Sequence, residues 1–346
     1  MRIDYLDRLA PAPGRVVVLR PTVDCQEAAD NAPVSPGGPS FLQGDHLGAY
    51  KARKASGGLH RAWTGAAGEF DEAYDEGAFV QAATALVRRH EGLRTWFDVS
   101  GDAPVRHLLG ADDVAFEAVD VEAPGDWDGG WEDFLVGLFD EQCTPDSWTP
   151  FRLGAIVRDG GFTYFWACDH AFTDGASQIM FPTELAVAYA TATGKPTFEL
   201  PEVASPIAYA ADEAQRAATY TAESPEVREW TEIVQRGEGR LPRFPLELGL
   251  APGETAPVRL RDIQVLDGAD KVAAFEQRCR AAGGRFTSGL FAALALTEQR
   301  LNGTERYFGV TVMGTRSGDY AMSHGWYCNF APVEFTLPKQ ASFDEV

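Results

Sequence analysis

The sequence predicts a mixed fold of the α/β (α+β) class that is built as two successive lobes. Aromatic-rich runs that suit buried strands alternate along the chain with segments whose apolar residues recur at helical spacing. The chain has 346 residues, of which 45% are hydrophobic, and this is enough for two domains with sizeable cores. The stretch 200–206 holds two prolines and suits a connecting segment, so we place the lobe boundary near residues 195–205.

The first predicted lobe contains both kinds of element. Two strands flank Arg158-Asp159-Gly160-Gly161, which is a strong hairpin signal. The helix that ends at His90 is predicted because four apolar residues between Val80 and Val87 fall on one helical face. The full set in this lobe is strands over 16–19, from 95, over 151–157 and over 162–168, with helices over 41–54, 78–90, 131–139 and 178–190.

The second predicted lobe shows the same alternation. We expect helices over 207–218, 225–235, 270–281 and 287–301, with strands over 258–265, 306–313 and 329–336. No internal sequence repeat is visible.

Charge and composition exclude several classes of protein. The formal net charge of −21 argues against nucleic-acid binding, which needs a basic surface, and it disfavours anionic membranes. No apolar run is long enough to span a bilayer, and the N-terminus leads into polar and acidic residues rather than an apolar signal core. We therefore expect a cytoplasmic protein without integral membrane association.

His170 is the first candidate for chemistry. It follows an aromatic-rich strand, stands on a short loop before a helix, and has Asp174 and Gly175 after it. Imidazole can accept and return a proton near neutral pH, and Gly175 permits a tight backbone turn. The alternative is an ordinary histidine in a strand-to-helix loop, with Asp174 capping the helix.

The five cysteines are scattered and odd in number, so they predict neither a disulfide framework nor a metal cluster. Cys168 lies two residues before His170, and strand alternation sends both side chains to the same side. A small buried hydrophobe is the favoured role of Cys168. A nucleophile paired with His170 is the alternative.

Four motifs along the chain resemble one family. His170-x-x-x-Asp174-Gly175-x-Ser177 resembles the HHxxxDGxS signature of the nonribosomal-peptide condensation-domain superfamily, which also contains chloramphenicol-acetyltransferase-like enzymes and polyketide-associated acyltransferases. The others follow in the family's order: Ser40-Phe41-Leu42-Gln43 resembles its opening motif, residues 89–97 match RHExLRTxF, and residues 309–332 resemble its "GxxxxGR … GxFvNxxPl" region. The resemblance spans nearly the whole chain.

This resemblance implies a fold and a reaction. The fold is two chloramphenicol-acetyltransferase-like lobes in a V arrangement, here residues 1–195 and 205–346 joined by 196–204, with a tunnel between them. The reaction moves an acyl group from the thioester of an acyl or peptidyl carrier protein, or of coenzyme A, to a small alcohol or amine. Phosphopantetheine is then carried by the substrate, and no cofactor or metal is bound by the enzyme.

The resemblance also implies roles for residues. His170 is the catalytic candidate, either as the base or as the group that positions the acceptor and steadies the tetrahedral intermediate. Asp174 and Gly175 support the site, with Asp174 paired to an arginine, for which Arg316 is the first choice. Arg89 and Arg94 are the other candidates for that arginine. We further expect Ser177 and Asn329 to line the tunnel and His90 to pack at a helix end. His46, His60, His107 and His324 are expected to be ordinary residues, because they lack metal-ligand spacing.

Two departures from the family pattern carry further expectations. Asp169 stands where members usually have a first histidine, and together with the approach over residues 33–39 this resembles the polyketide-associated branch, which acylates hydroxyls. We therefore expect ester formation in natural-product or lipid biosynthesis. The second departure is that the chain ends at Val346 without the family's DFGW motif, so we expect a second lobe that is incomplete relative to the family.

Three alternatives remain open at this stage. The enzyme can form amides, as peptide-forming condensation domains do, or the chain can be a non-catalytic member that binds a carrier protein. The third is a thiol enzyme that uses Cys168. A carrier protein is usually acidic and would need a basic docking patch, for which residues 51–54 and 236–243 are candidates.

Overall fold

The computed structural model describes residues 9, 11–125, 127, 130–251, 254, 256 and 265–346. Its contacts divide the chain into two compact units, Met1–Thr219 with Gly314–Asn329, and Tyr220–Met313 with Phe330–Val346. This division differs from the expected boundary near 195–205. Helix α6 (Pro206–Ala217) and the segment Gly314–Asn329 both belong to the first unit.

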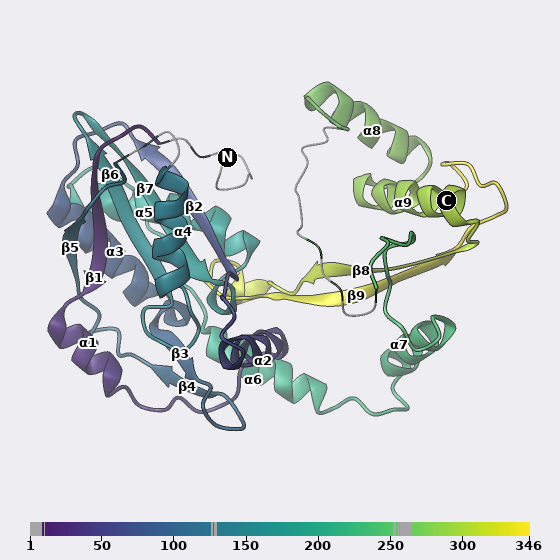
Figure 1. The fold of residues 1–346 in the computed structure, drawn as a ribbon, viewed down its shortest axis with the longest axis horizontal. Helices are drawn as coiled ribbons and strands as arrows, with labels where there is room; N and C mark the ends of the chain where they lie inside the picture. Colours follow the sequence, from purple (N-terminus) through teal and green to yellow (C-terminus); the bar gives the residue numbers. More distant parts are fainter. Residues whose placement is uncertain are drawn as a thin grey trace. The chain divides into compact units, whose positions relative to one another are not determined.

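The first unit is built on a five-stranded sheet in the order β2-β7-β6-β1-β5 (Figure 1), whose neighbouring strands are all antiparallel. The strands are β1 (Arg15–Pro21), β2 (Trp63–Phe70), β5 (Phe116–Val121), β6 (Phe151–Arg158) and β7 (Gly161–Asp169). The predicted hairpin is confirmed, because β6 and β7 pair up to Arg158 and Gly161. Gly160 in its turn has a φ of +80°, a conformation that favours glycine.

Strand β7, which leads to the candidate site, is buried on both faces. Tyr164, Trp166 and Cys168 join the core that also holds the apolar faces of α3 (Glu76–Arg89) and α5 (Gly175–Ala192). Phe165 and Ala167 face the opposite core, which is closed by α4 (Gly130–Gln142). A strand buried on both faces needs an unbroken apolar run, and this explains the aromatic-rich sequence before His170.

The remaining elements of the first unit complete its edges. Helices α1 (Val23–Asp30) and α2 (Phe41–Ala55) come early in the chain, and β3 (Thr95–Asp98) pairs with β4 (Val105–Leu108) in a separate two-stranded sheet. The sequence patterns did not predict α1, β2, β4 or β5. Strand β2 is the most informative of these, because a Cβ on its Gly65 would lie 2.2 Å from the Trp166 carbonyl oxygen. Glycine is required there by the close backbone, although glycine lowers strand propensity.

The second unit is smaller. It contains α7 (Pro225–Arg236), α8 (Ala269–Ala281) and α9 (Phe286–Asn302), with most of β8 (Arg306–Gly314) and β9 (Cys328–Thr336), which form a two-stranded sheet. Its core gathers Ala295, Leu296, Tyr307, Leu337 and Ala341. All of these helices and strands were predicted. A further strand was expected over 258–265, and its residues 258–264 lie outside the described ones.

Candidate active site

His170 stands where β7 ends. The strand finishes at Asp169, a short 3-10 turn covers His170–Phe172, and α5 begins at Gly175. The backbone fixes this turn from both sides, since the Asp169 N–H donates to the Pro150 carbonyl at 2.9 Å and the His170 N–H donates to the Ala62 carbonyl at 2.8 Å. The imidazole is therefore presented by a rigid strand end, as the sequence predicted.

The His170 ring is half-buried, and its two nitrogens differ in environment. Nδ1 is buried and has no hydrogen-bond partner in the part of the chain that the structure describes. Nε2 is not among the buried unpaired atoms. The ring packs on Trp326, with the two centroids 4.3 Å apart and the planes tilted by 40°. The side chain thus has one buried, unpaired nitrogen and one aromatic neighbour.

Asp174 is paired with Arg316, the arginine that the sequence favoured. Arg316 Nη2 donates to both carboxylate oxygens of Asp174, at 2.8 and 3.0 Å, and both side chains are about nine-tenths buried. The same carboxylate accepts the N–H of Ser177 at 2.8 Å, so it also caps α5, and the N–H of Tyr327 at 3.0 Å. Asp174 therefore ties the start of α5 to the segment Gly314–Asn329.

The other candidate arginines are used elsewhere. Arg89 contacts Glu184 and the Pro201 carbonyl, while Arg94 donates to the Leu109 carbonyl.

Ser177, Gly175 and Asn329 lie in different surroundings. Ser177 is fully buried, and its hydroxyl contacts Arg316 and the Gly325 backbone, so it holds the turn instead of facing an open space. Gly175 has no positive φ, and a Cβ there would meet no atom within 4 Å, so the expected tight turn does not explain this glycine. Asn329 is half-buried in β9, and its role as a tunnel wall stays a prediction.

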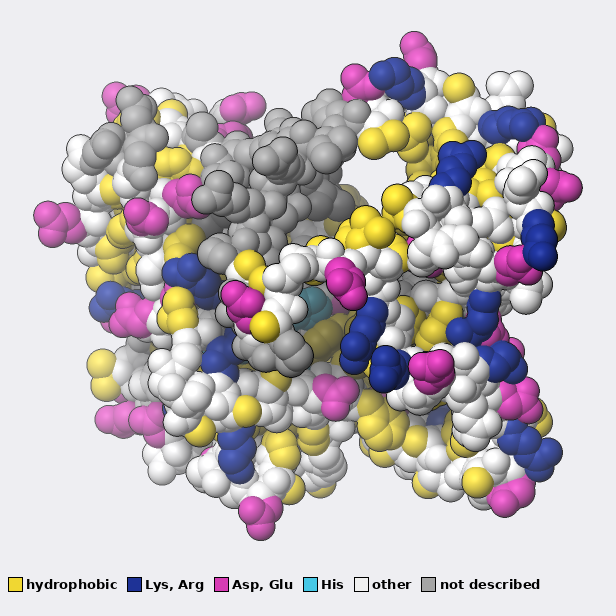
Figure 2. All heavy atoms as spheres, turned by 45° about the vertical axis from the view of Figure 1, so that its right-hand side comes forward, with side chains coloured by type: hydrophobic (Ala, Val, Ile, Leu, Met, Phe, Trp, Pro, Cys, Tyr) yellow, Lys and Arg dark blue, Asp and Glu magenta, His cyan; other side chains and the backbone are white. Residues whose placement is uncertain are grey.

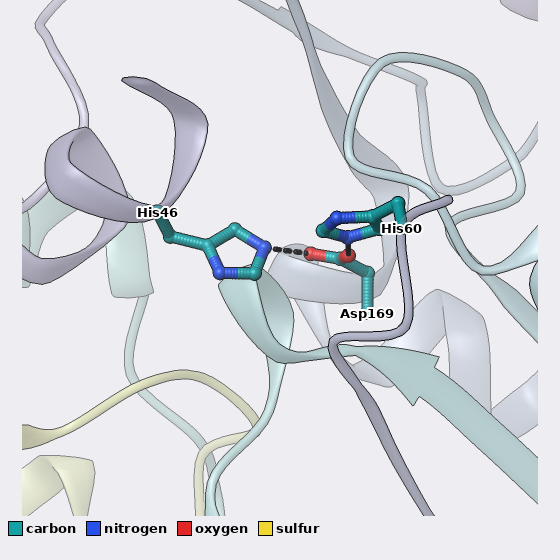
Figure 3. A group of neighbouring side chains, drawn as sticks. All are labelled: His46, His60 and Asp169. Carbon is teal, nitrogen blue, oxygen red and sulfur yellow. Dashed lines mark hydrogen bonds and ion pairs between the residues drawn. The ribbon is translucent and has the colours of Figure 1, made fainter. Parts of the chain in front are cut away.

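The structure assembles a group around Asp169 that the sequence did not reveal (Figure 3). His46 from α2 and His60 from the loop before β2 reach the two oxygens of the Asp169 carboxylate, at 2.9 and 2.7 Å. Burial raises the pKa of Asp169, but the hydrogen bonds from His46, His60 and the Ala171 N–H outweigh it and hold the pKa below its ordinary value. Both histidines were expected to be ordinary because they show no metal-ligand spacing, and they lie 123 and 109 residues from Asp169 in the sequence.

A second buried group surrounds Glu184. His90 Nε2 donates to this carboxylate at 2.7 Å, and His324 Nε2 lies 3.2 Å from the same oxygen. Burial, with His324 beside it, lowers the pKa of His90 to about 4. Burial raises the pKa of the Glu184 carboxyl, but the bonds from His324 and His90 outweigh it and hold that pKa well below its usual range. His90 packs at the end of α3, as predicted.

Cys168 is fully buried in the core, as the favoured interpretation expected. Burial raises the pKa of its thiol well above the ordinary value, with small contributions from Cys143 and Asp169. A neutral, inaccessible thiol is a poor nucleophile. The five cysteines are all free.

Two of the basic residues in the candidate patches form ion pairs with acidic side chains. Lys54 pairs with Asp146, Lys51 donates to the Gly101 carbonyl, and Arg236 pairs with Glu334. On the face drawn in Figure 2, Lys and Arg side chains are interspersed with Asp and Glu. No helix in the described ranges is long and apolar enough to cross a membrane.

Comparisons with known proteins identify the family. Residues 49–346 match the family model described as Condensation domain. The chain belongs to the condensation-domain family. Acyltransferase PapA3 of Mycobacterium tuberculosis (strain CDC 1551 / Oshkosh) is 30% identical over 99% of this chain and 72% of its own length. The relative named 2'-acyl-2-O-sulfo-trehalose (hydroxy)phthioceranyltransferase PapA1, from Mycobacterium bovis (strain BCG / Pasteur 1173P2), is 31% identical over 97% of this chain and 65% of its length.

A solved acyltransferase structure agrees with the fold. The structure titled "PapA2 acyl transferase" superposes with a TM-score of 0.85 at 25% identity, and the alignment covers 98% of this chain and 73% of that one. The predicted mixed α/β class and the predicted membership among the acyltransferases of the condensation-domain family are both confirmed, whereas the V arrangement and the tunnel stay predictions. The chain spans 65–73% of the length of these relatives.

Proposed function

We propose that this condensation-family acyltransferase forms esters, with His170 as its catalytic residue. Nε2 of His170 takes the proton of an acceptor hydroxyl as the oxygen attacks the carbonyl carbon of a thioester. The tetrahedral intermediate then collapses, the carbon–sulfur bond breaks, and the leaving thiolate takes the proton back from His170. Acyl group, proton and thiol are all accounted for, and the chain itself is unchanged at the end.

The observation that carries this proposal is the setting of the His170 ring. The imidazole is held at a strand end and its Nδ1 is buried without a partner, so Nε2 is the nitrogen that we propose exchanges a proton with a bound substrate. Trp326 adds a second contribution. Its ring lies against the imidazole, and an aromatic face attracts the positive charge that forms when His170 takes the proton.

The substrates are proposed by class. We expect the donor to be a thioester on a carrier protein or coenzyme A, so that phosphopantetheine arrives with the substrate. The acceptor is proposed to be a hydroxyl, because Asp169 replaces the first histidine of the motif and because relatives are named for acylating trehalose derivatives, among them Trehalose-2-sulfate acyltransferase PapA2 of Mycobacterium bovis (strain BCG / Pasteur 1173P2). The biosynthesis of an acylated lipid or natural product is the proposed setting.

The test is a thioester-consumption assay on the full chain. Acyl-coenzyme A donors of different length are offered with sugar alcohols, simple alcohols and matched amines, the released thiol is measured, and the product is identified by mass spectrometry. We expect esters, and we expect His170→Ala to stay folded and to lose about 10²- to 10⁴-fold in turnover. Unchanged turnover in His170→Ala would refute the mechanism, and exclusive acylation of amines would refute the choice of acceptor.

A further inference from the structure

Both residues beside His170 accept hydrogen bonds from side chains that are distant in the sequence. On one side, the Asp169 carboxylate receives His46 at 2.9 Å and His60 at 2.7 Å (Figure 3). On the other side, the Ala171 carbonyl accepts a hydrogen bond from Gln43 Nε2 at 2.7 Å. The catalytic turn is therefore fixed by side chains as well as by its own backbone.

Helix α2 supplies two of these three side chains. Gln43 and His46 are three residues apart, so they project from the same face of the helix. The orientation of Gln43 is set in turn by the start of the helix, because its Oε1 accepts the Ser40 N–H at 3.0 Å in a capping box. The last residue of the opening motif Ser40-Phe41-Leu42-Gln43 is thus hydrogen-bonded to the turn that carries His170.

The buried charge of Asp169 makes the loss of any of its hydrogen bonds costly. Its side chain is fully buried and forms no ion pair with lysine or arginine within the described part of the chain. Its charge is met by three N–H donors, from His46, His60 and the Ala171 backbone. Leaving a buried acceptor without its donor costs about 1–3 kcal/mol, and more for a charged group, so the turn is held in one arrangement.

The distances favour hydrogen bonds over a shared metal ion. Two ligand atoms on one tetrahedral zinc ion lie about 3.3 Å apart, as follows from zinc–ligand bonds near 2 Å. Here the imidazole nitrogens lie 2.9 and 2.7 Å from two different oxygens of Asp169, which is the spacing of N–H···O bonds. Ring contacts keep the imidazoles in place, since His60 meets the edge of Tyr50 and His46 meets Trp326, the ring that packs on His170.

We propose that Gln43, His46 and His60 are positioning residues for acyl transfer, which fix His170 through hydrogen bonds to Asp169 and Ala171. This inference rests on the proposed function of His170. A displacement of about 1 Å in a catalytic group can cost about 10²-fold in rate, so loss of one of these bonds acts on kcat and leaves substrate binding nearly unchanged.

Two substitutions test the inference on the full chain. Gln43→Glu keeps the oxygen that accepts the Ser40 N–H, so the helix start is retained, but it removes the donor to Ala171. His60→Leu removes a donor to Asp169, and His60→Gln restores an N–H at similar reach. We expect Gln43→Glu and His60→Leu to lower kcat about 10- to 100-fold with little change in KM, and His60→Gln to recover most of it.

A matched control is His107→Leu. His107 is half-buried whereas His60 is buried, but it likewise forms one side-chain hydrogen bond, from Nδ1 to the Ala32 carbonyl at 3.1 Å, and it stacks on Trp96, apart from the catalytic turn. We expect its kcat to match the wild type. Urea unfolding of each variant shows that activity is measured on folded protein.

The outcomes separate the two proposals. If His170→Ala is inactive and Gln43→Glu and His60→Leu both turn over like the wild type, the positioning inference is wrong while the proposed function stands. If His60→Gln is as slow as His60→Leu, the hydrogen bond to Asp169 is not what matters. If His170→Ala itself keeps full turnover, the proposed function fails first.

Discussion

The pair between Asp174 and Arg316 gives the sharpest prediction about stability. Asp174→Asn removes the negative charge but keeps one side-chain oxygen, so the cap on α5 is largely retained. What is lost is the ion pair with Arg316, in which Nη2 reaches both carboxylate oxygens at 2.8 and 3.0 Å, together with the oxygen that accepts the Tyr327 N–H. We therefore expect Asp174→Asn to leave a buried guanidinium without its counter-charge.

The size of the effect follows from burial. The side chains of Asp174 and Arg316 are only 10% and 12% exposed, so water cannot replace the lost partner. Removing one member of a buried ion pair costs about 3–5 kcal/mol. The exposed pair Arg15–Asp120, with side chains 47% and 65% exposed, is the control, and Asp120→Asn should cost less than about 1 kcal/mol.

The assay is urea unfolding followed by tryptophan fluorescence. Of the eight tryptophans only Trp230 lies in the second unit, so the signal reports mainly on the unit that holds the pair. Arg316→Met and the double variant complete a double-mutant cycle, in which the double variant should lose less than the sum of the single losses. A loss in Asp174→Asn no larger than that of Asp120→Asn, or strictly additive losses in the cycle, would show that the reasoning about this pair is wrong.

Two further predictions concern buried titratable groups. Between its lowered pKa of about 4 and the ordinary 6.5, His90 is neutral in the folded chain while the unfolded chain binds a proton there, so the free energy of unfolding decreases as the pH falls through this window. We expect this decrease to be smaller in His90→Gln, measured by urea unfolding at several pH values, and an identical pH dependence would contradict the assignment. Burial raises the pKa of the Cys168 thiol, so we expect Cys168→Ala to keep a kcat close to that of the wild type in the thioester assay. A loss of kcat as large as that of His170→Ala would instead support a mechanism that uses the thiol.

Local patterns predicted most of the elements and the position of His170. The hairpin before it, the helix after it and most of the helices elsewhere are set by turn residues and apolar spacing, which act within a few residues. Strand β2 escaped prediction because it pairs along β7 with a glycine at position 65, where the close Trp166 backbone leaves no room for a side chain. That constraint comes from a strand about a hundred residues away in the sequence.

The candidate site was only partly predictable for the same reason. The pairing of Asp174 with Arg316 joins residues 142 apart, and it was expected only because both fall in motifs that resemble one family. His46 and His60 belong to no such motif, so no spacing in the sequence links them to Asp169. Their role depends on α2 and the loop before β2 meeting at the end of β7, which only the folded chain shows.

The discontinuity of the first unit has a consequence for the order of folding during synthesis. Asp174 leaves the ribosome 142 residues before Arg316, and translation at about 5–20 residues per second makes that interval about 7–28 s. During this interval the nascent first unit lacks the segment Gly314–Asn329. That segment supplies the Arg316 guanidinium and the Tyr327 N–H that bind Asp174. The first unit therefore cannot reach its final state co-translationally until the segment Gly314–Asn329 has been made.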